Sequence, residues 1–372
     1  MGTEAREVGE ISTQNRLQDL KNQFECSVDN RAISELISIS KFLLEDQLKD
    51  PIDTQSVETI LARINSWNKE IAKRLKQVGC NFEEPKEYRT LEDAENDPLE
   101  KAIDSYFNSR GYYFGYEDFL VGENLVIAPT LRKIDEKRGI DIKSYFSDWN
   151  KYFPDIPSVQ IPIVFFGHDE TDTAFKMHQS EQQIWHGTHN EKGIQIFRGD
   201  YNRFMKKVDP SISPKILFHE EQNTVADEMG HAFFKEALGF EAEYGDSTDA
   251  EITFEFNENS ASVFQLNELC SMLSRFRFGT SFVANLEWLL VYESPETSAE
   301  QYSFGRDFLI SLFHERMIEL GISDTFAYVD YCKKLPEEKL DEEKNLVISR
   351  AEEVFFTKMV PSAKEAIEKI KK

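Results

Sequence analysis

The sequence predicts an α+β fold that is predominantly helical, with one small mixed sheet near the middle of the chain. Apolar residues recur at helical spacing before residue 80 and after Phe264, whereas two short apolar runs between residues 159 and 199 resemble strands. The 372 residues are enough for two or three domains and a substantial core. We expect a helical region over residues 1–80, a linker over 81–98, a domain that holds the sheet over 99–270 and a second helical region over 271–372.

The composition is acidic, with 43 Lys and Arg against 68 Asp and Glu and a formal net charge of −25. Such a chain repels nucleic acids and anionic lipid surfaces, and its basic residues form only short pairs. The four cysteines lie far apart with no Cys-x-x-Cys spacing, which indicates free thiols in a reducing compartment. The start lacks an apolar signal region, and no window approaches 18 apolar residues. We therefore expect a cytoplasmic protein with no nucleic-acid or membrane partner.

The N-terminal region is expected to form a helical hairpin. One helix runs from about Ile33 to Leu48, and the next begins at Val57 and ends at Gly79. The second helix carries an apolar stripe at a spacing close to 3.5 residues: Val57, Leu61, Ile64, Trp67, Ile71, Leu75 and Val78. The stripe packs either inside the hairpin or against a helical protein partner, because three heptads are a minimal coiled coil.

The middle of the chain changes to strand-like patterns. Val159–Phe166 and Gly193–Gly199 are expected strands, and the His-rich segment between them, which includes His186 and His189, is expected as a solvated turn or a metal clamp. A helix should begin at Ser213-Pro214 and end at Gly239. Its polar segment over His219–Thr224 leaves open whether this stretch is one continuous helix or two. After Phe264 the chain is expected to be helical to its end.

Two short clusters carry the candidate chemistry. In the first, Asp227 and His231 stand four residues apart, so both side chains share one helical face and can reach one ion. Glu228 is rotated by about 100° around the helix axis, so it misses the ion but can reach a bound water as a general base. Gly230 would let another backbone approach closely. The second cluster, Asn257–Phe264, is expected on a helix that places Glu258 opposite.

The first cluster resembles the metal-binding helix of zincin metallopeptidases, whose motif is His-Glu-x-x-His. Asn257-Glu258-Asn259-Ser260-Ala261 is similar to the Asn-Glu-x-x-Ala block of gluzincins, and the order of strand, edge strand, motif helix and Glu helix over residues 155–270 is also similar. The resemblance implies a zincin-like domain in which Asp227, His231 and Glu258 bind the ion. It further implies that Glu228 deprotonates the water that attacks a carbonyl of a peptide or protein substrate.

The sequence departs from the motif at Asp227, which stands where the family has His. An Asp carboxylate reaches less far from the backbone than an imidazole. Two carboxylates with one His neutralise a 2+ ion, whereas two His with one Glu leave a net charge of +1, so the water is activated less strongly. Zn²⁺ is the expected metal, with Mn²⁺ or Fe²⁺ as alternatives because harder ions accept oxygen ligands.

Three other interpretations are open. A catalytically degenerate zincin-like protein would serve binding or scaffolding, and an unrelated helical core would leave Glu228 and His231 as a surface pair. Glu228-x-x-His231 also matches half of a di-iron bundle, but no other His has Glu three residues before it. The favoured prediction is a metal-dependent peptidase with Glu228 as general base.

Overall fold

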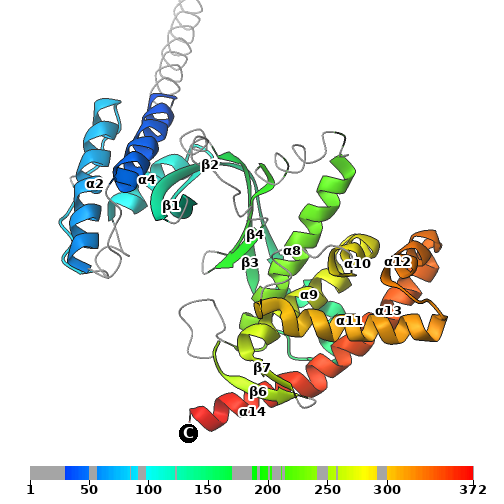
Figure 1. The fold of residues 1–372 in the computed structure, drawn as a ribbon. Coiled ribbons are helices and arrows are strands. Elements are labelled where there is room, and N and C mark those ends of the chain that lie inside the picture. The colour runs from blue at the N-terminus through cyan, green and yellow to red at the C-terminus, as the bar shows by residue number, and fades with distance from the viewer. Residues whose placement is uncertain are drawn as a thin grey trace, which may run out of the picture. The chain divides into compact units, whose positions relative to one another are not determined.

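The computed structural model describes residues 30–49, 57–83, 85–90, 98–121, 124–169, 187–190, 193–199, 202, 211, 214–240, 250–256, 259–290 and 300–371. These residues are mostly helical and add one five-stranded mixed sheet and one two-stranded hairpin (Figure 1), which confirms the helical α+β class. Contacts divide the chain into unit 1, within residues 1–135 and 166–184, and unit 2, within 136–165 and 185–372. The chain passes between the units at 135–136, 165–166 and 184–185, and the expected boundaries at 80, 98 and 270 stay predictions.

Unit 1 contains a helix over residues 30–49, α2 (Val57–Gln77), α4 (Pro98–Asn108) and β1 (Tyr112–Val121), which pairs antiparallel with β2 (Asn124–Asp141). The apolar stripe of α2 is largely buried against the preceding helix: Trp67, Ile71 and Leu75 pack with Leu36, Ile39 and Leu43. The stripe therefore packs within its own unit. Gly79 follows α2 with a φ of 101°, a conformation that suits glycine at a helix end. A protein partner for this region stays a prediction.

The five-stranded sheet has the strand order β1-β2-β3-β5-β4. The two expected strands are present as β3 (Gln160–Asp169) and β5 (Gly193–Ile196), and they run parallel. Strand β4 (Gly187–Asn190) pairs antiparallel with β5 at the sheet edge. The turn expected around His189 is thus wrong, because these residues form the edge strand. Gly193, with a φ of 105°, permits the sharp reversal that brings β4 back along β5.

Helix α8 (Pro214–Glu236) begins at the expected proline and continues without a break through the polar segment. The hairpin of β6 (Thr253–Phe256) and β7 (Asn259–Ser262) follows, and then α9 (Val263–Phe278). The helix expected across Asn257–Phe264 is therefore wrong for Asn259–Ser262. Ser262 is the N-cap, since its side chain accepts from the Gln265 backbone N–H while the Gln265 side chain accepts from the Ser262 N–H.

The rest of unit 2 is helical, as expected. It comprises α5 (Ile142–Tyr145), a 3₁₀ turn (Ser147–Lys151), α10 (Phe282–Leu290), α11 (Glu300–Leu320), α12 (Thr325–Lys334), α13 (Glu337–Val354), a π-helical segment (Phe355–Met359) and α14 (Val360–Ile370). Cys270 and Cys332 are buried free thiols. Among the described helices, none is both long and apolar enough to cross a membrane.

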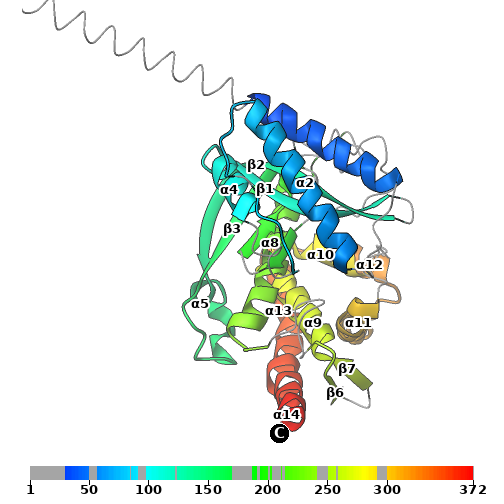
Figure 2. The same ribbon diagram turned by 90° about the vertical axis from the view of Figure 1, so that its left-hand side faces the viewer.

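An aromatic cluster anchors the C-terminal half of α8. Phe233 lies two residues after His231, and its ring centroid is 4.6 Å from that of Phe146 and 4.9 Å from that of Trp149. Trp149 in turn contacts Phe356 at 5.1 Å. These rings pack the end of α8 against the π-helical segment near the C-terminus, and α9 lies alongside α8 (Figures 1 and 2).

Candidate metal centre

Helices α8 and α9 pack closely at Gly230. A Cβ atom at Gly230 would lie 2.5 Å from the Cα of Ser271 and 2.9 Å from the Cβ of Ser274, so only glycine permits this approach. The Ser274 hydroxyl adds a hydrogen bond to the carbonyl oxygen of Ala226. The close backbone approach expected from a mid-helix glycine is confirmed, and it brings the middle of α9 against α8 next to His231.

Four titratable side chains interact electrostatically where the two helices pack, and we name them the α8–α9 cluster: Asp227, Glu228 and His231 from α8 and Glu268 from α9. The exposed fraction is 8% for Glu228 and 6% for Glu268, whereas Asp227 and His231 keep partial exposure. The two glutamates are therefore withdrawn from solvent, and the other two groups remain accessible.

Asn267 orients the imidazole of this cluster. His231 Nδ1 lies 3.0 Å from Asn267 Oδ1, and an amide oxygen can only accept, so the Nδ1–H donates. In the neutral ring this bond leaves Nε2 without a proton, and Nε2 is then the atom available to bind a cation.

The cluster shifts the pKa of three of its members. Burial raises the pKa of Glu228 to about 8, and the charges of Asp227 and Glu268 add to the rise. Burial likewise raises the pKa of Glu268 to about 7. Burial alone would lower the pKa of His231, but the three surrounding carboxylates outweigh it and raise this pKa to about 9. Among the described residues, no Lys or Arg charge acts on either glutamate.

The edge strand lies against the same part of α8. A Cβ atom at Gly187 would lie 2.8 Å from Thr224 Cγ2 and 3.0 Å from Glu228 Oε1, so this strand position also needs glycine. The backbone N–H of His189 donates a hydrogen bond to the Glu228 carboxylate. Glu228 is thus held between α8 and β4.

The expected site residues are brought together only in part. Asp227, Glu228 and His231 share one region of α8, as predicted, whereas Glu258 lies outside the described residues. Glu268 takes part in the cluster and was missed. The signal that could have found it is Asn267-Glu268-x-x-Ser271, which repeats the Asn-Glu spacing within an apolar helical stretch.

His219 and His314, whose side chains the structure describes, do not join the cluster. His219 stands 12 residues before His231 on the unbroken α8, and its Nδ1 contacts Thr280 Oγ1 at 2.9 Å. His314 is exposed on α11, and His178 and His186 lie outside the described residues.

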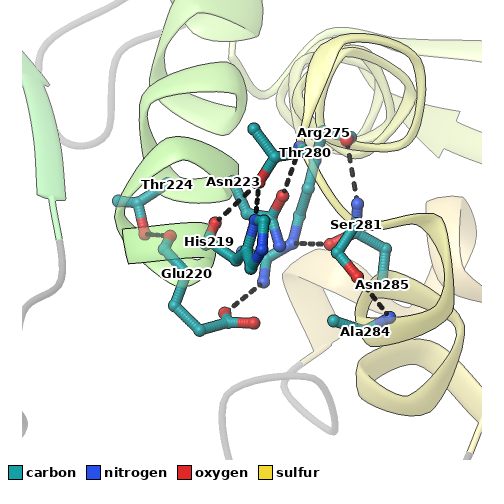
Figure 3. Close-up of polar contacts among 9 residues, drawn as sticks. All are labelled: His219, Glu220, Asn223, Thr224, Arg275, Thr280, Ser281, Ala284 and Asn285. Atoms are coloured by element: carbon teal, nitrogen blue, oxygen red, sulfur yellow. Dashed lines mark hydrogen bonds and ion pairs between the residues drawn. The ribbon is translucent and has the colours of Figure 1, made fainter. Parts of the chain in front are cut away.

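A second polar network fixes the N-terminal half of α8 (Figure 3). Arg275 on α9 donates to Glu220 on α8 at 3.2 Å and to Asn285 on α10 at 3.0 Å. Asn223 Oδ1 accepts from the Thr280 backbone N–H at 3.0 Å, and Asn223 Nδ2 is buried with no hydrogen-bond partner among the described residues. This network sets the register of α8 and α9 upstream of the α8–α9 cluster.

The donor set of the cluster suits a divalent cation. Three carboxylates and one imidazole provide oxygen and nitrogen ligands, and a cation would compensate the negative charge that the two buried glutamates carry when ionised. In the part of the chain that the structure describes, no three His, Cys, Asp or Glu side chains converge closely enough to hold an ion. The chemistry of the donors, rather than a preformed geometry, is what fits the metal.

No protein-family model, no curated protein and no solved structure matches this chain. Any function assigned to the α8–α9 cluster therefore depends on its residues and their geometry.

Proposed function

We propose that the protein is a metal-dependent hydrolase of peptide bonds, with a zincin-like domain whose centre is the α8–α9 cluster. The observation that carries this proposal is the burial of Glu228 and Glu268 beside His231, on two helices that approach through Gly230. Burying carboxylates without a compensating cation is costly, so such a pair is expected where a cation binds. The chain order of two strands, β3 and β5, followed by two helices, α8 and α9, supports the proposal, although Gly193–Ile196, the expected edge strand, lies between β3 and β4 in the sheet.

Asp227, His231 and Glu268 would hold the ion, with Zn²⁺ as the expected metal and Mn²⁺ or Fe²⁺ as alternatives. When bound, the ion would lower the pKa of a water molecule and polarise the substrate carbonyl. His231 would bind through Nε2 because Asn267 occupies Nδ1. Glu228 accepts and returns protons, a task that suits a carboxyl whose pKa lies near the working pH.

The edge strand supports a peptide as the substrate. Among the described strands, β4 is the last of its sheet, and it lies directly beside Glu228. Extended peptides pair with exposed sheet edges through backbone hydrogen bonds. A peptide aligned with β4 would pass its backbone next to the α8–α9 cluster.

Asp227 favours a second candidate function. Its carboxylate is shorter than the imidazole of the zincin motif and leaves the bound ion less positive. A protein of this kind would bind peptides, or act as a scaffold, without hydrolysing them.

Metal analysis and one substitution separate the two candidates. Bound metal and hydrolysis of a casein-derived peptide mixture are measured for the wild type, Glu228→Gln and the control Glu236→Gln, which changes an exposed glutamate of the same helix. We expect Glu228→Gln to keep the metal and lose activity by about 10²–10⁴-fold, the usual range for a general base. Bound metal without hydrolysis in the wild type supports the second candidate. No metal after loading with Zn²⁺, Mn²⁺ or Fe²⁺ contradicts both metal site and hydrolase.

A further inference from the structure

The hydrogen bond from His189 to Glu228 occupies the outer side of the edge strand. Successive residues of a strand direct their backbone groups to opposite sides, and the His189 N–H reaches a side chain of α8 instead of β5. This N–H therefore lies on the side of β4 where a further strand would pair. Gly187, two residues earlier, directs its backbone groups to the same side.

The contact depends on how closely β4 approaches α8. With glycine at position 187, Glu228 Oε1 lies 3.0 Å from the point that a Cβ atom would occupy, and Glu228 Cγ lies 3.1 Å from it. Any larger residue would push the Glu228 side chain away from the strand. The carboxylate is thus confined to a place from which it accepts the His189 N–H.

We propose that the His189 N–H is a shared donor, accepted by Glu228 in the free protein and by a carbonyl of an extended peptide when the peptide pairs with β4. The exchange releases Glu228 from the strand as the peptide binds. The proposal rests on the proposed function in one respect, because it takes an extended peptide as the ligand. It adds that peptide binding and the position of Glu228 are linked through one backbone proton.

The exchange is feasible because the two acceptors compete for the same proton. An N–H donor makes one well-aligned hydrogen bond, so the carboxylate and a peptide carbonyl exclude each other at His189. Removing the Glu228 carboxyl group ends this competition, so the variant should bind the peptide about tenfold more tightly.

The first test is amide hydrogen exchange at His189, followed by NMR. We expect the His189 amide to exchange about tenfold faster in Glu228→Ala than in the wild type, since the variant lacks the acceptor. Glu228→Gln keeps a side-chain oxygen and should retain part of the protection, and Glu236→Ala should leave the rate unchanged. Equal His189 rates in the wild type and Glu228→Ala would overturn the proposal.

The second test measures binding of a probe, an equimolar mixture of acetyl- and amide-capped hexapeptides. We expect the mixture to bind Glu228→Ala about tenfold more tightly than the wild type and to restore slow exchange at His189. A mixture N-methylated at alternate residues cannot pair as a strand and should show no such difference. Equal affinity of the unmethylated mixture for both proteins would overturn the proposal.

A second variant tests the shared donor if Glu228→Ala fails to fold. Gly187→Ala displaces the carboxylate while Glu228 itself remains, so it should speed His189 exchange in the same direction. Failure of the shared donor is distinguishable from failure of the hydrolase. If His189 exchanges equally in the wild type and Glu228→Ala while the wild type binds metal and hydrolyses peptides, only the shared donor is refuted. If His189 exchange follows the predicted pattern but the wild type neither binds metal nor hydrolyses peptides, the shared donor is supported and only the hydrolase is refuted.

Discussion

Two regions of unit 2 bury glutamates in opposite ways. Four glutamates are buried in the part of the chain that the structure describes: Glu228 and Glu268 in the α8–α9 cluster, and Glu343 and Glu352 on α13. The pair on α13 is neutralised by arginines, whereas the pair in the cluster faces an imidazole and further carboxylates. The difference separates a structural use of buried acid from a candidate binding site.

The α13 glutamates have complete ion pairs. Glu343 accepts two bonds of 2.9 Å from the guanidinium of Arg316, and Tyr328 adds a hydroxyl donor at 2.9 Å. Glu352 accepts from Arg277 at 2.6 and 2.7 Å. Bidentate pairs of this kind satisfy the carboxylate oxygens and leave no need for a cation. Burial alone therefore does not mark a site; the identity of the partner does.

The largest effect is expected from breaking one of the arginine pairs. Glu352→Ala removes the only carboxylate within 4.0 Å of the Arg277 guanidinium among the described residues, and it removes the acceptor of the Trp149 indole N–H. The Arg277 side chain is 8% exposed and keeps only the neutral acceptors Asn345 and Ser349. Unfolding in urea should show a loss of roughly 3–5 kcal/mol, the usual cost of an unpaired buried charge. The neighbouring exposed residue provides the control, and Glu353→Ala should change stability little. Similar losses of unfolding free energy in Glu352→Ala and Glu353→Ala would contradict a structural role for the buried ion pair of Glu352.

A smaller effect is expected from separating the helices of the cluster. Gly230→Ala forces α8 and α9 apart and should cost roughly 1–3 kcal/mol, with loss of bound metal. Gly305→Ala is a matched control on α11, where the nearest atoms belong to Leu269 at 3.2 Å. Its gain in helix propensity of about 1 kcal/mol offsets the tighter contact, so stability and metal content should both stay near the wild type. Metal retained in Gly230→Ala would count against the α8–α9 cluster as the site.

The pH dependence of stability distinguishes the two regions without disrupting the fold. Glu228, Glu268 and His231 all have raised pKa values in the folded protein, near 8, 7 and 9. The folded state therefore binds more protons than the unfolded state, and the metal-free protein should lose stability as pH rises from about 5 to 9. The expected loss is on the order of a few kcal/mol, because each pKa unit corresponds to about 1.4 kcal/mol and the two glutamates are buried.

Urea unfolding in the presence of a chelator measures this decline. The double variant Glu228→Gln, Glu268→Gln should flatten the curve while the ion pairs of α13 are unchanged. A decline of the same size in the double variant would assign it to groups outside the α8–α9 cluster.

The smallest effect is expected at an exposed ion pair. Arg350 and Glu315 lie 2.7 Å apart, but their side chains are 55% and 52% exposed. Arg350→Ala should change the free energy of unfolding by no more than about 0.5 kcal/mol, because water and salt screen such pairs. A loss as large as that of Glu352→Ala, measured in the same urea titration, would show that burial does not separate these pairs.

The sequence was sufficient for the part of the site that lies within one helix. The four-residue spacing of Asp227 and His231 predicts a shared face, and a mid-helix Gly230 predicts a close neighbour; both follow from helix geometry alone. The continuation of α8 through its polar segment was left open, because those side chains are satisfied by α9 and α10, which local sequence does not reveal.

The contributions of α9 and β4 could not be predicted in the same way. Helix α9 is buried on nearly every side, so Glu268 does not stand out by periodicity. Because Asn257-Glu258 is similar to a family motif, Glu258 was predicted as the Glu ligand, and it precedes strand β7 in the chain. Strand β4 has only four residues and lacks alternation, so Gly187–Asn190 resembled a turn.

Metal binding by two glutamine variants tests whether the α8–α9 cluster is the metal site. The wild type, Glu268→Gln and Glu258→Gln are titrated with Zn²⁺ and Mn²⁺ in a calorimeter, and bound metal is then measured after gel filtration. We expect one ion per chain in the wild type, loss of that ion in Glu268→Gln and its retention in Glu258→Gln. An ion that survives Glu268→Gln, or no ion in the wild type at any loading, would contradict it.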